Sequence, residues 1–364
     1  MSLLWETVED MNVGFDSEFF NRKLKIGLDY FRRESSNMLM QKSLLSYVGF
    51  GFVSQWANVG SMKTNGLEFE ISHRNSIGKL RYNIGLNLSQ AHSVMVSLAD
   101  GEAIWEGNDQ RLGSLTYTAE EGTTEEGIVE EGTVGAFYGF VTDGIFQNQD
   151  EIDNYVGGED DRIIQRTASP GDFKFLDLND DGRLTAADDR QVIGNPEPLF
   201  TYGLNMGASM YGVDFRMVIT GTYGNDLITP IKAYTHSGSS SYNSYAGLID
   251  DAWNGEGTSN TQPRVTNRDA NQNFRYSDFY VSDGSYLRIK SLQIGYNLPQ
   301  AWMSKVKVNN IRVFVNVENL YTFTNYEGLD PDVGPYYGNI LMRGVNWGNY
   351  PLPRNITAGI NVTF

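Results

Sequence analysis

Apolar and polar residues alternate along much of this chain, most regularly in its last ten residues. Successive side chains of a β-strand point to opposite faces, so this alternation predicts a strand with one apolar and one polar face. The apolar positions are Ile356, Ala358, Ile360, Val362 and Phe364, and the small or polar positions are Asn355, Thr357, Gly359, Asn361 and Thr363.

The same pattern recurs upstream and predicts a series of amphipathic strands. The predicted segments are 24–30, 67–73, 80–88, 200–210, 213–219, 292–298 and 311–317. We expect one face to hold Leu80, Tyr82, Ile84, Leu86, Phe200, Leu204, Met206, Ile311, Val313 and Val315, and the other to hold Asn83, Asn87, Asn205 and Asn316. A soluble sandwich and a membrane barrel both give this periodicity, so the pattern alone leaves the two open.

The lengths of the connections favour the barrel. Short connections at 16–22, 74–79, 211–212 and 299–310 alternate with long ones at 34–65, 97–199, 222–285 and 323–353. Outer-membrane barrels have short periplasmic turns and long extracellular loops. We therefore predict an all-β, antiparallel transmembrane β-barrel architecture with ten spanning strands. In it we expect Phe364 at the periplasmic end, and the strand that ends on this aromatic residue resembles the assembly signal of bacterial outer-membrane barrels.

Composition narrows the possible functions. The 39 glycines, 21 tyrosines and 19 phenylalanines among 364 residues favour β structure with tight turns. No run of 18 apolar residues indicates a transmembrane helix, and zero cysteines excludes thiolate metal sites. A net charge of −17 argues against a nucleic-acid partner, which requires a basic surface.

A calcium-type loop at 177–188 is the sharpest chemical motif, and it lies in the predicted extracellular region 97–199. Its oxygen-bearing residues have the spacing that surrounds one Ca²⁺ ion, and Gly182 permits the sharp bend. The predicted ligands are Asp177, Asn179, Asp181, the carbonyl of Arg183, Thr185 and Asp188. Asp at the last position matches the dockerin variant. We expect a structural ion, and the alternative is an Asp-rich turn capped by its own side chains.

No residue pattern predicts an enzyme. His73, His92 and His236 are isolated in the sequence, and acidic pairs arise by chance in so acidic a chain. Loop aromatics could instead stack on sugars or bury a peptide, with ordinary loop packing as the alternative. The candidate ligand contacts are Tyr234, Tyr242, Tyr245, Trp253, Tyr336, Tyr337 and Trp347.

Several ordered motifs resemble the carboxy-terminal portion of SusC/RagA-type TonB-linked outer-membrane transporters of the Bacteroidetes. They include 5–7 with 12–16, 65–68, 137–140 with 143–146, 193–196 after the calcium-type loop, 201–203, 283–288, 318–321 and 350–354. The similarity covers essentially all of 1–364. It implies that the ten expected strands are the last ten of a 22-stranded barrel.

The resemblance also implies a function and partners. Such transporters import oligosaccharides or peptides through the outer membrane, using energy from the TonB complex and a SusD-like surface lipoprotein as lid. The barrel assembly machinery and membrane lipid are further expected partners. We expect the plug domain and TonB-contacting segment to lie outside this chain, which starts without a signal peptide. A soluble calcium-dependent glycan-binding β module is the alternative, and a carbohydrate-active enzyme a third possibility.

Overall fold

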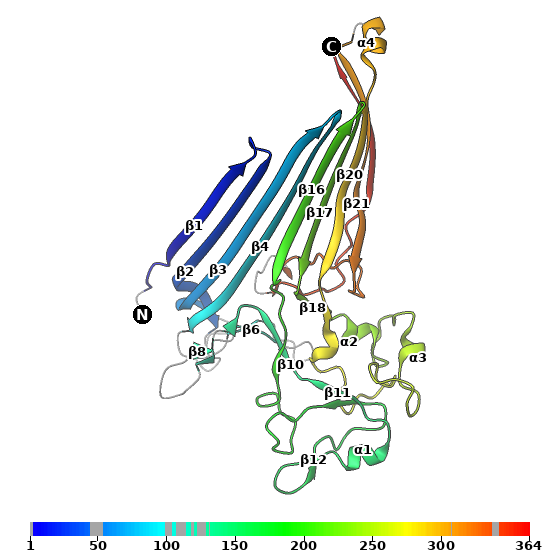
Figure 1. Cartoon of the computed structure of the whole chain (residues 1–364). Coiled ribbons are helices and arrows are strands. Elements are labelled where there is room, and N and C mark those ends of the chain that lie inside the picture. The colour runs from blue at the N-terminus through cyan, green and yellow to red at the C-terminus, as the bar shows by residue number, and fades with distance from the viewer. Residues whose placement is uncertain are drawn as a thin grey trace.

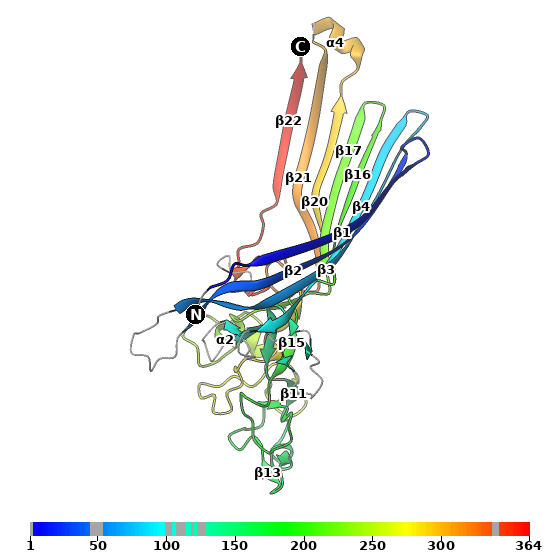
Figure 2. The same ribbon diagram turned by 90° about the vertical axis from the view of Figure 1, so that its left-hand side faces the viewer.

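A long, curved antiparallel sheet dominates the computed structural model, and the larger connecting segments gather beyond one end of it (Figure 1, Figure 2). The structure describes residues 3–43, 54–98, 104–106, 114–117, 120–121, 129–130, 132–306, 308–336 and 342–364. The long strands, in spatial order, are β1 (Thr7–Phe19), β2 (Leu24–Ser43), β3 (Ser54–Ile77), β4 (Leu80–Leu98), β16 (Phe200–Met210), β17 (Val213–Tyr223), β20 (Tyr286–Asn297), β21 (Asn310–Thr324) and β22 (Asn355–Thr363).

The number of spanning strands differs from the prediction. The main sheet of the described residues has ten strands, but the tenth, β9 (Gly132–Thr133), is a two-residue strand beside β4. Nine long strands therefore run along the sheet, and the expected count of ten spanning strands is corrected to nine. The four short and four long connections identified in the sequence separate nine strands, so no segment remains for a tenth spanning strand.

The pairing register confirms the predicted division into two faces. Leu86 lies opposite Leu204, which lies opposite Ile219, so apolar side chains continue from strand to strand. Asn205 lies opposite Gly85 on one side and Val218 on the other, on the second face. We call these the apolar face and the polar face. A one-residue slip would exchange them along a whole strand, so the apolar pattern fixes the register.

Glycines on the polar face make room for large neighbours. A Cβ atom added to Gly203 would lie 2.3 Å from Oδ1 of Asn87, its cross-strand partner, and one added to Gly207 would lie 2.3 Å from Oδ1 of Asn83. The ring of Phe314 covers Gly359 in the same way, with 2.5 Å between its Cζ atom and that Cβ position. These side chains therefore lie along the sheet, over the neighbouring strand.

The short connections all lie at one end of the sheet, as predicted (Figure 1). Tyr211 and Gly212 form a two-residue turn with φ of 52° and 85°, the left-handed pair that matches the twist of a hairpin. The β20–β21 connection contains the helix α4 (Gln300–Val306), which lies near the carboxy-terminus (Figure 2). We call this the turn end, and the opposite end the loop end.

At the loop end, segments from the long connections fold around two small cores. One core centres on Phe137, Tyr276 and Tyr280, and the second contains Phe173 and Phe175. The elements there are β5 (Ile104–Glu106), β6 (Ser114–Tyr117), β7 (Glu120–Glu121), β8 (Val129–Glu130), β10 (Ala136–Gly139), β11 (Thr142–Ile145), α1 (Gln149–Asp153), β12 (Val156–Gly157), β13 (Arg162–Ile163), β14 (Phe173–Phe175), β15 (Gln191–Gly194), β18 (Asp226–Ile228), α2 (Lys232–Thr235), α3 (Leu248–Asp251), the 3₁₀ helix Asp278–Tyr280 and β19 (Val281–Asp283).

A buried polar network joins the β4–β16 and β17–β20 connections. Asp172 is fully buried and accepts hydrogen bonds from Arg264 Nε at 2.7 Å and Asn273 Nδ2 at 2.9 Å. The Asn273 Oδ1 atom in turn accepts from the Phe173 N–H at 2.9 Å. Because a buried charge without partners is costly, this network holds the two connections together as one folded unit.

The sheet is open in this chain. Its edges are β1 and β22, and within the described residues neither pairs with a further strand. No helix among the described residues combines the length and the apolar character required to cross a membrane.

The apolar face gives a first testable prediction. Met206 lies in the middle of β16 on this face, and Asn205 lies beside it on the polar face. In the complete barrel that contains this chain, Met206→Arg should destabilise the folded state by about 2–4 kcal/mol, since it places a cation in the hydrocarbon layer. Urea unfolding in lipid vesicles measures this cost. Asn205→Arg is the matched control, and an equal cost for both variants would contradict the assignment of the faces.

Candidate functional site

Four of the predicted loop aromatics lie together at the loop end. The Tyr234 ring lies 5.4 Å from the Tyr242 ring and 6.5 Å from the Trp347 ring, measured between centroids. The Tyr336 ring lies 6.1 Å from that of Trp347. Tyr242 is 69% exposed, and the other three side chains are half-buried. We call Tyr234, Tyr242, Tyr336 and Trp347 the aromatic patch.

Backbone bridging between two connections positions the aromatic patch. The Ile228 N–H donates to the Gly344 carbonyl at 2.9 Å, and the Asn346 N–H donates to the Ile228 carbonyl at 2.8 Å. The β21–β22 connection is thereby fixed to β18, and Val345 is buried in the core around Phe137. This anchoring places Trp347 beside Tyr234, which lies in the short helix α2.

An arginine on β20 fixes the beginning of the same connection. Arg288 is 3% exposed, and its Nε donates to Thr322 Oγ1 at 2.9 Å. Its Nη1 lies 3.1 Å from Asp332 Oδ2, and its Nη2 donates to Asp330. Asp330 Oδ2 also accepts from the Leu352 N–H at 3.0 Å, so one ionic cluster ties both parts of the connection to the sheet. We call this cluster the Arg288 latch.

The other predicted aromatics do not join the patch. Tyr245 stacks on His236 at 4.2 Å between ring centroids and donates its hydroxyl to Asp251. Trp253 packs against Gly171 and donates from Nε1 to Gln147 Oε1 at 3.0 Å, which is a structural role. Tyr337 lies outside the described residues. Burial lowers the pKa of His236 to about 4, so this ring is neutral at physiological pH.

The calcium-type loop closes on itself through its own side chains. Asp177 Oδ2 accepts from the Gly182 N–H at 2.8 Å, and Asp181 Oδ1 accepts from the Arg183 N–H at 2.9 Å. At the end of the loop, the Thr185 hydroxyl donates to Asp188 Oδ2 at 2.9 Å. The glycine at 182 has a φ of 78°, and a Cβ atom there would lie 2.3 Å from the Gly157 carbonyl oxygen.

The donors of this loop match a hard cation in chemistry, since all of them are oxygens. Within the described part of the chain, however, no three His, Cys, Asp or Glu side chains gather closely enough to hold a metal ion. The Asp177, Asn179 and Asp181 oxygens instead accept N–H groups of the loop. The arrangement is that of a turn capped by its own side chains. To bind an ion, the carboxylates of the loop would have to move closer together.

Asp189 is a structural residue that the sequence analysis missed. It is fully buried, and its carboxylate accepts from the Leu178 N–H at 2.9 Å and the Thr185 N–H at 2.6 Å. Burial raises the pKa of Asp189, and the neighbouring Asp177 and Asp181 carboxylates raise it further. No pattern in the sequence distinguishes Asp189 from the adjacent Asp188, so its burial could not be predicted.

The curved sheet, its two chemically distinct faces and its short turns at one end define this chain as part of an outer-membrane-type β-barrel. The family model described as "TonB dependent receptor-like, beta-barrel" matches residues 2–320. The chain therefore belongs to this family, whose members are outer-membrane transporters and not enzymes.

Similar proteins agree with this assignment. The chain is 31% identical to TonB-dependent receptor P3 of Formosa agariphila, in an alignment that covers 100% of this chain and 34% of that protein. It is 22% identical to TonB-dependent receptor SusC of Bacteroides thetaiotaomicron, covering 100% of this chain and 32% of SusC. The chain thus spans about a third of the length of these relatives.

A solved structure shows the same fold. The structure of the RagAB peptide transporter matches with a TM-score of 0.75 at 21% identity, over 99% of this chain and 35% of that chain. The match covers the sheet and the loop end together. The predicted SusC/RagA resemblance is thereby confirmed at the level of family and fold.

The Arg288 latch generates a second prediction. Replacing Arg288 with Met leaves the largely buried Asp330 without its cation, and breaking such a pair costs about 3–5 kcal/mol. We expect faster amide hydrogen exchange in residues 325–336 and 342–354 of the complete protein, with β3 and β4 unchanged. Arg354→Met, which removes an exposed arginine near the same connection, is the control. Unchanged exchange in the Arg288 variant would contradict the role of the latch.

Proposed function

We propose that this chain supplies nine adjacent strands of a larger barrel that imports nutrients across the outer membrane with energy delivered through TonB. The open sheet is the observation that carries this proposal. A bilayer does not hydrogen-bond the backbone groups of β1 and β22, so sheets span membranes only as closed barrels. Further strands must therefore cover both edges, and the chain spans about a third of its relatives.

The substrate in this proposal is an oligosaccharide or a peptide. The aromatic patch offers one exposed and three half-buried rings with polar tips, which can stack on a sugar or cover apolar side chains of a peptide. The fold match to RagAB, a peptide transporter by its description, supports the peptide class. The net charge of −17 favours neutral or cationic substrates over anionic ones.

A SusD-like surface lipoprotein is the proposed partner at the loop end, as the family relationship to SusC and RagAB suggests. The TonB complex would act through a plug region and not through the strands described above. The barrel assembly machinery is the proposed partner for insertion, with the terminal strand and Phe364 as its signal. Family membership argues against the soluble glycan-binding module that the motif and aromatics alone left open.

Growth tests can separate these possibilities. A strain that lacks the gene and a strain that lacks TonB should both fail to grow on the same nutrient, tested over a panel of oligosaccharides and a protein digest as sole carbon source. Growth only on the digest would assign peptides, and growth only on one glycan would assign that sugar. Uptake that continues without TonB would overturn the proposed mechanism.

The aromatic patch gives a third prediction. Trp347→Ala should raise the substrate concentration for half-maximal uptake about tenfold, because loss of an aromatic anchor costs about 1–2 kcal/mol. Tyr350→Ala is the matched control, since Tyr350 is 91% exposed in the same connection and lies outside the patch. Uptake assays with the nutrient identified above measure both variants. Equal uptake by the Trp347 variant and the parent would remove the patch from the substrate path.

We further propose that the calcium-type loop binds one structural Ca²⁺ ion. The proposed ligands are Asp177, Asn179, Asp181, the Arg183 carbonyl, Thr185 and Asp188, as predicted from their spacing. The all-oxygen donor set supports the proposal, and so does the tight contact of Gly182 with the Gly157 backbone, which holds the bend. The ion would order the chain ahead of β15 and β16.

The calcium proposal leads to a fourth prediction. The complete protein in detergent should bind calcium in titration calorimetry with a dissociation constant on the order of 10⁻⁴ to 10⁻³ M, as extracellular modules do. Asp177→Asn should weaken this binding at least about tenfold, because it removes one charged ligand. Glu159→Gln, an exposed acid in the neighbouring hairpin, is the control. No heat of binding at millimolar calcium would refute the site.

Phe364 gives a fifth prediction. It is 86% exposed at the end of the terminal strand, where no intramolecular packing explains an aromatic residue. Phe364→Ala should reduce the folded, membrane-inserted fraction of the complete protein in cells severalfold, as judged by heat-modifiable gel mobility. Thr363→Ala, on the opposite face of the same strand, should have little effect. Normal insertion of the Phe364 variant would exclude it as the assembly signal.

A further inference from the structure

A buried asparagine lies next to the tryptophan of the aromatic patch. Asn346 is 3% exposed, and it directly precedes Trp347 in the β21–β22 connection. Its Oδ1 atom accepts hydrogen bonds from the Gly348 N–H at 2.8 Å and from the Asn349 N–H at 2.9 Å. The side chain thus closes a local turn that contains Trp347, in the way that asparagine commonly stabilises turns.

The amide nitrogen of the same side chain contacts a second element. Asn346 Nδ2 donates to the Tyr326 hydroxyl oxygen at 2.6 Å, and that hydroxyl shares a hydrogen bond of 2.9 Å with Thr229 Oγ1. Thr229 directly follows β18, in the connection that also carries Tyr234. One buried amide therefore links the turn of Trp347 to both connections that form the aromatic patch.

Tyr326 is itself fixed to the main sheet. It is 6% exposed, and its backbone N–H donates to Thr324 Oγ1 at 3.1 Å. The Thr324 hydroxyl donates in turn to the Ser285 carbonyl at 2.9 Å. The Tyr326 ring covers Gly328, where an added Cβ atom would lie 2.2 Å from its Cε1 atom. The position of the Tyr326 hydroxyl is therefore set by the loop-end termini of β20 and β21.

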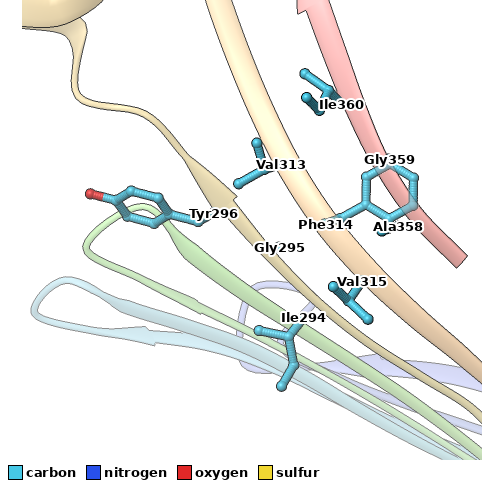
Figure 3. A pocket seen from close by; sticks show the side chains of 9 residues that line it. All are labelled: Ile294, Gly295, Tyr296, Val313, Phe314, Val315, Ala358, Gly359 and Ile360. Atoms are coloured by element: carbon cyan, nitrogen blue, oxygen red, sulfur yellow. The ribbon is translucent and has the colours of Figure 1, made fainter. Parts of the chain in front are cut away.

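The two strands that flank this connection hold only its ends. β21 and β22 pair in continuous register, with Val315 opposite Ala358 and Val313 opposite Ile360. These side chains line an apolar hollow of about 530 Å³ (Figure 3). Trp347 lies in the interior of the connection, so its position depends on contacts that are made there.

Hydrogen bonds define the position of Trp347 more closely than ring contacts do. Its centroid distances of 6.5 Å to the Tyr234 ring and 6.1 Å to the Tyr336 ring lie near the long end of the range for aromatic pairs. Such contacts are weak and permit several ring positions. The hydrogen bonds of the Asn346 amide are short and directional, and they are made in a buried site.

We propose that Asn346 is the positioning residue of the aromatic patch, and that its bond to Tyr326 holds Trp347 in the arrangement that binds substrate. A patch that is ordered before the substrate arrives loses less conformational freedom on binding. Asn346 is buried and acts through Trp347. The inference rests on the proposed function of the patch, but the position of Trp347 is measurable without any substrate.

Acrylamide quenching of Trp347 emission tests the positioning directly. The complete protein is measured in detergent, and the Trp347 contribution is the difference between each variant and the same variant with Trp347→Phe. Tyr326→Phe removes one oxygen and leaves the buried Asn346 Nδ2 donor without its partner. Because an unpaired buried donor is costly, we expect the quenching constant of Trp347 to rise at least about twofold. Asn346→Ala should have the same effect.

Two matched variants make this test specific. Asn349→Ala removes an exposed amide from the same turn and should leave the quenching of Trp347 unchanged. Thr229→Val keeps the bond between Asn346 and Tyr326 and should cause a smaller rise than Tyr326→Phe. Unchanged quenching in Tyr326→Phe and Asn346→Ala would overturn the proposal, and so would an equal rise in Asn349→Ala.

A binding measurement separates positioning from general stability. The probe is a fluorescein-labelled tryptic digest of casein, titrated with the complete protein in detergent and followed by anisotropy. Asn346→Ala should raise the dissociation constant at least about threefold, because the patch is no longer ordered in advance. In the Trp347→Ala background the same substitution should have no further effect, since Asn346 acts through that ring.

The outcomes of this titration are distinct. Fewer binding sites at an unchanged dissociation constant, or additive effects of the two substitutions, would assign Asn346 a general structural role and contradict the proposal. A parent protein that does not bind the digest would count against the peptide class in the proposed function. The quenching of Trp347 would then still decide whether Asn346 positions the ring.

Discussion

The backbone of a membrane-spanning segment must satisfy its own hydrogen bonds, because hydrocarbon offers none. In this chain backbone hydrogen bonds between neighbouring strands meet that requirement from β2 to β21, and every pair of long strands is antiparallel. The same requirement explains the alternation of faces. Because the backbone of each strand is hydrogen-bonded to its neighbouring strands, its side chains can be apolar on the face that contacts lipid and polar on the opposite face.

The loop end obeys a different rule. Outside the membrane water satisfies exposed polar groups, and only those that the folded connections bury need partners within the chain. Asp172 with Arg264 joins two connections, and Arg288 with Asp330 ties a third to the sheet. The aromatic patch is assembled from the β17–β20 and β21–β22 connections, which are the connections that Arg264 and Asp330 belong to.

The sequence predicted the structure best where a single physical constraint determines the residue pattern. Period-two alternation predicted the faces of β4, β16 and β21 because lipid contact leaves few alternatives, and the connection lengths predicted which turns share an end. The expected count of ten spanning strands was wrong, because four short and four long connections separate only nine strands. Residues whose role depends on distant partners, such as Arg288 and Asp189, carry no local signal. The same limit applies to Trp253, a candidate ligand contact in the sequence, whose Nε1 donates to the distant Gln147.

Glycines on the polar face determine how far the neighbouring side chains extend from the sheet. Because Asn87 and Asn83 lie flat over Gly203 and Gly207, their amides do not extend far from the wall. Over these two pairs the polar face is therefore flatter than its asparagines suggest. A side chain at either glycine would lift the opposing amide away from the backbone, so the relief of this part of the face depends on residues without side chains.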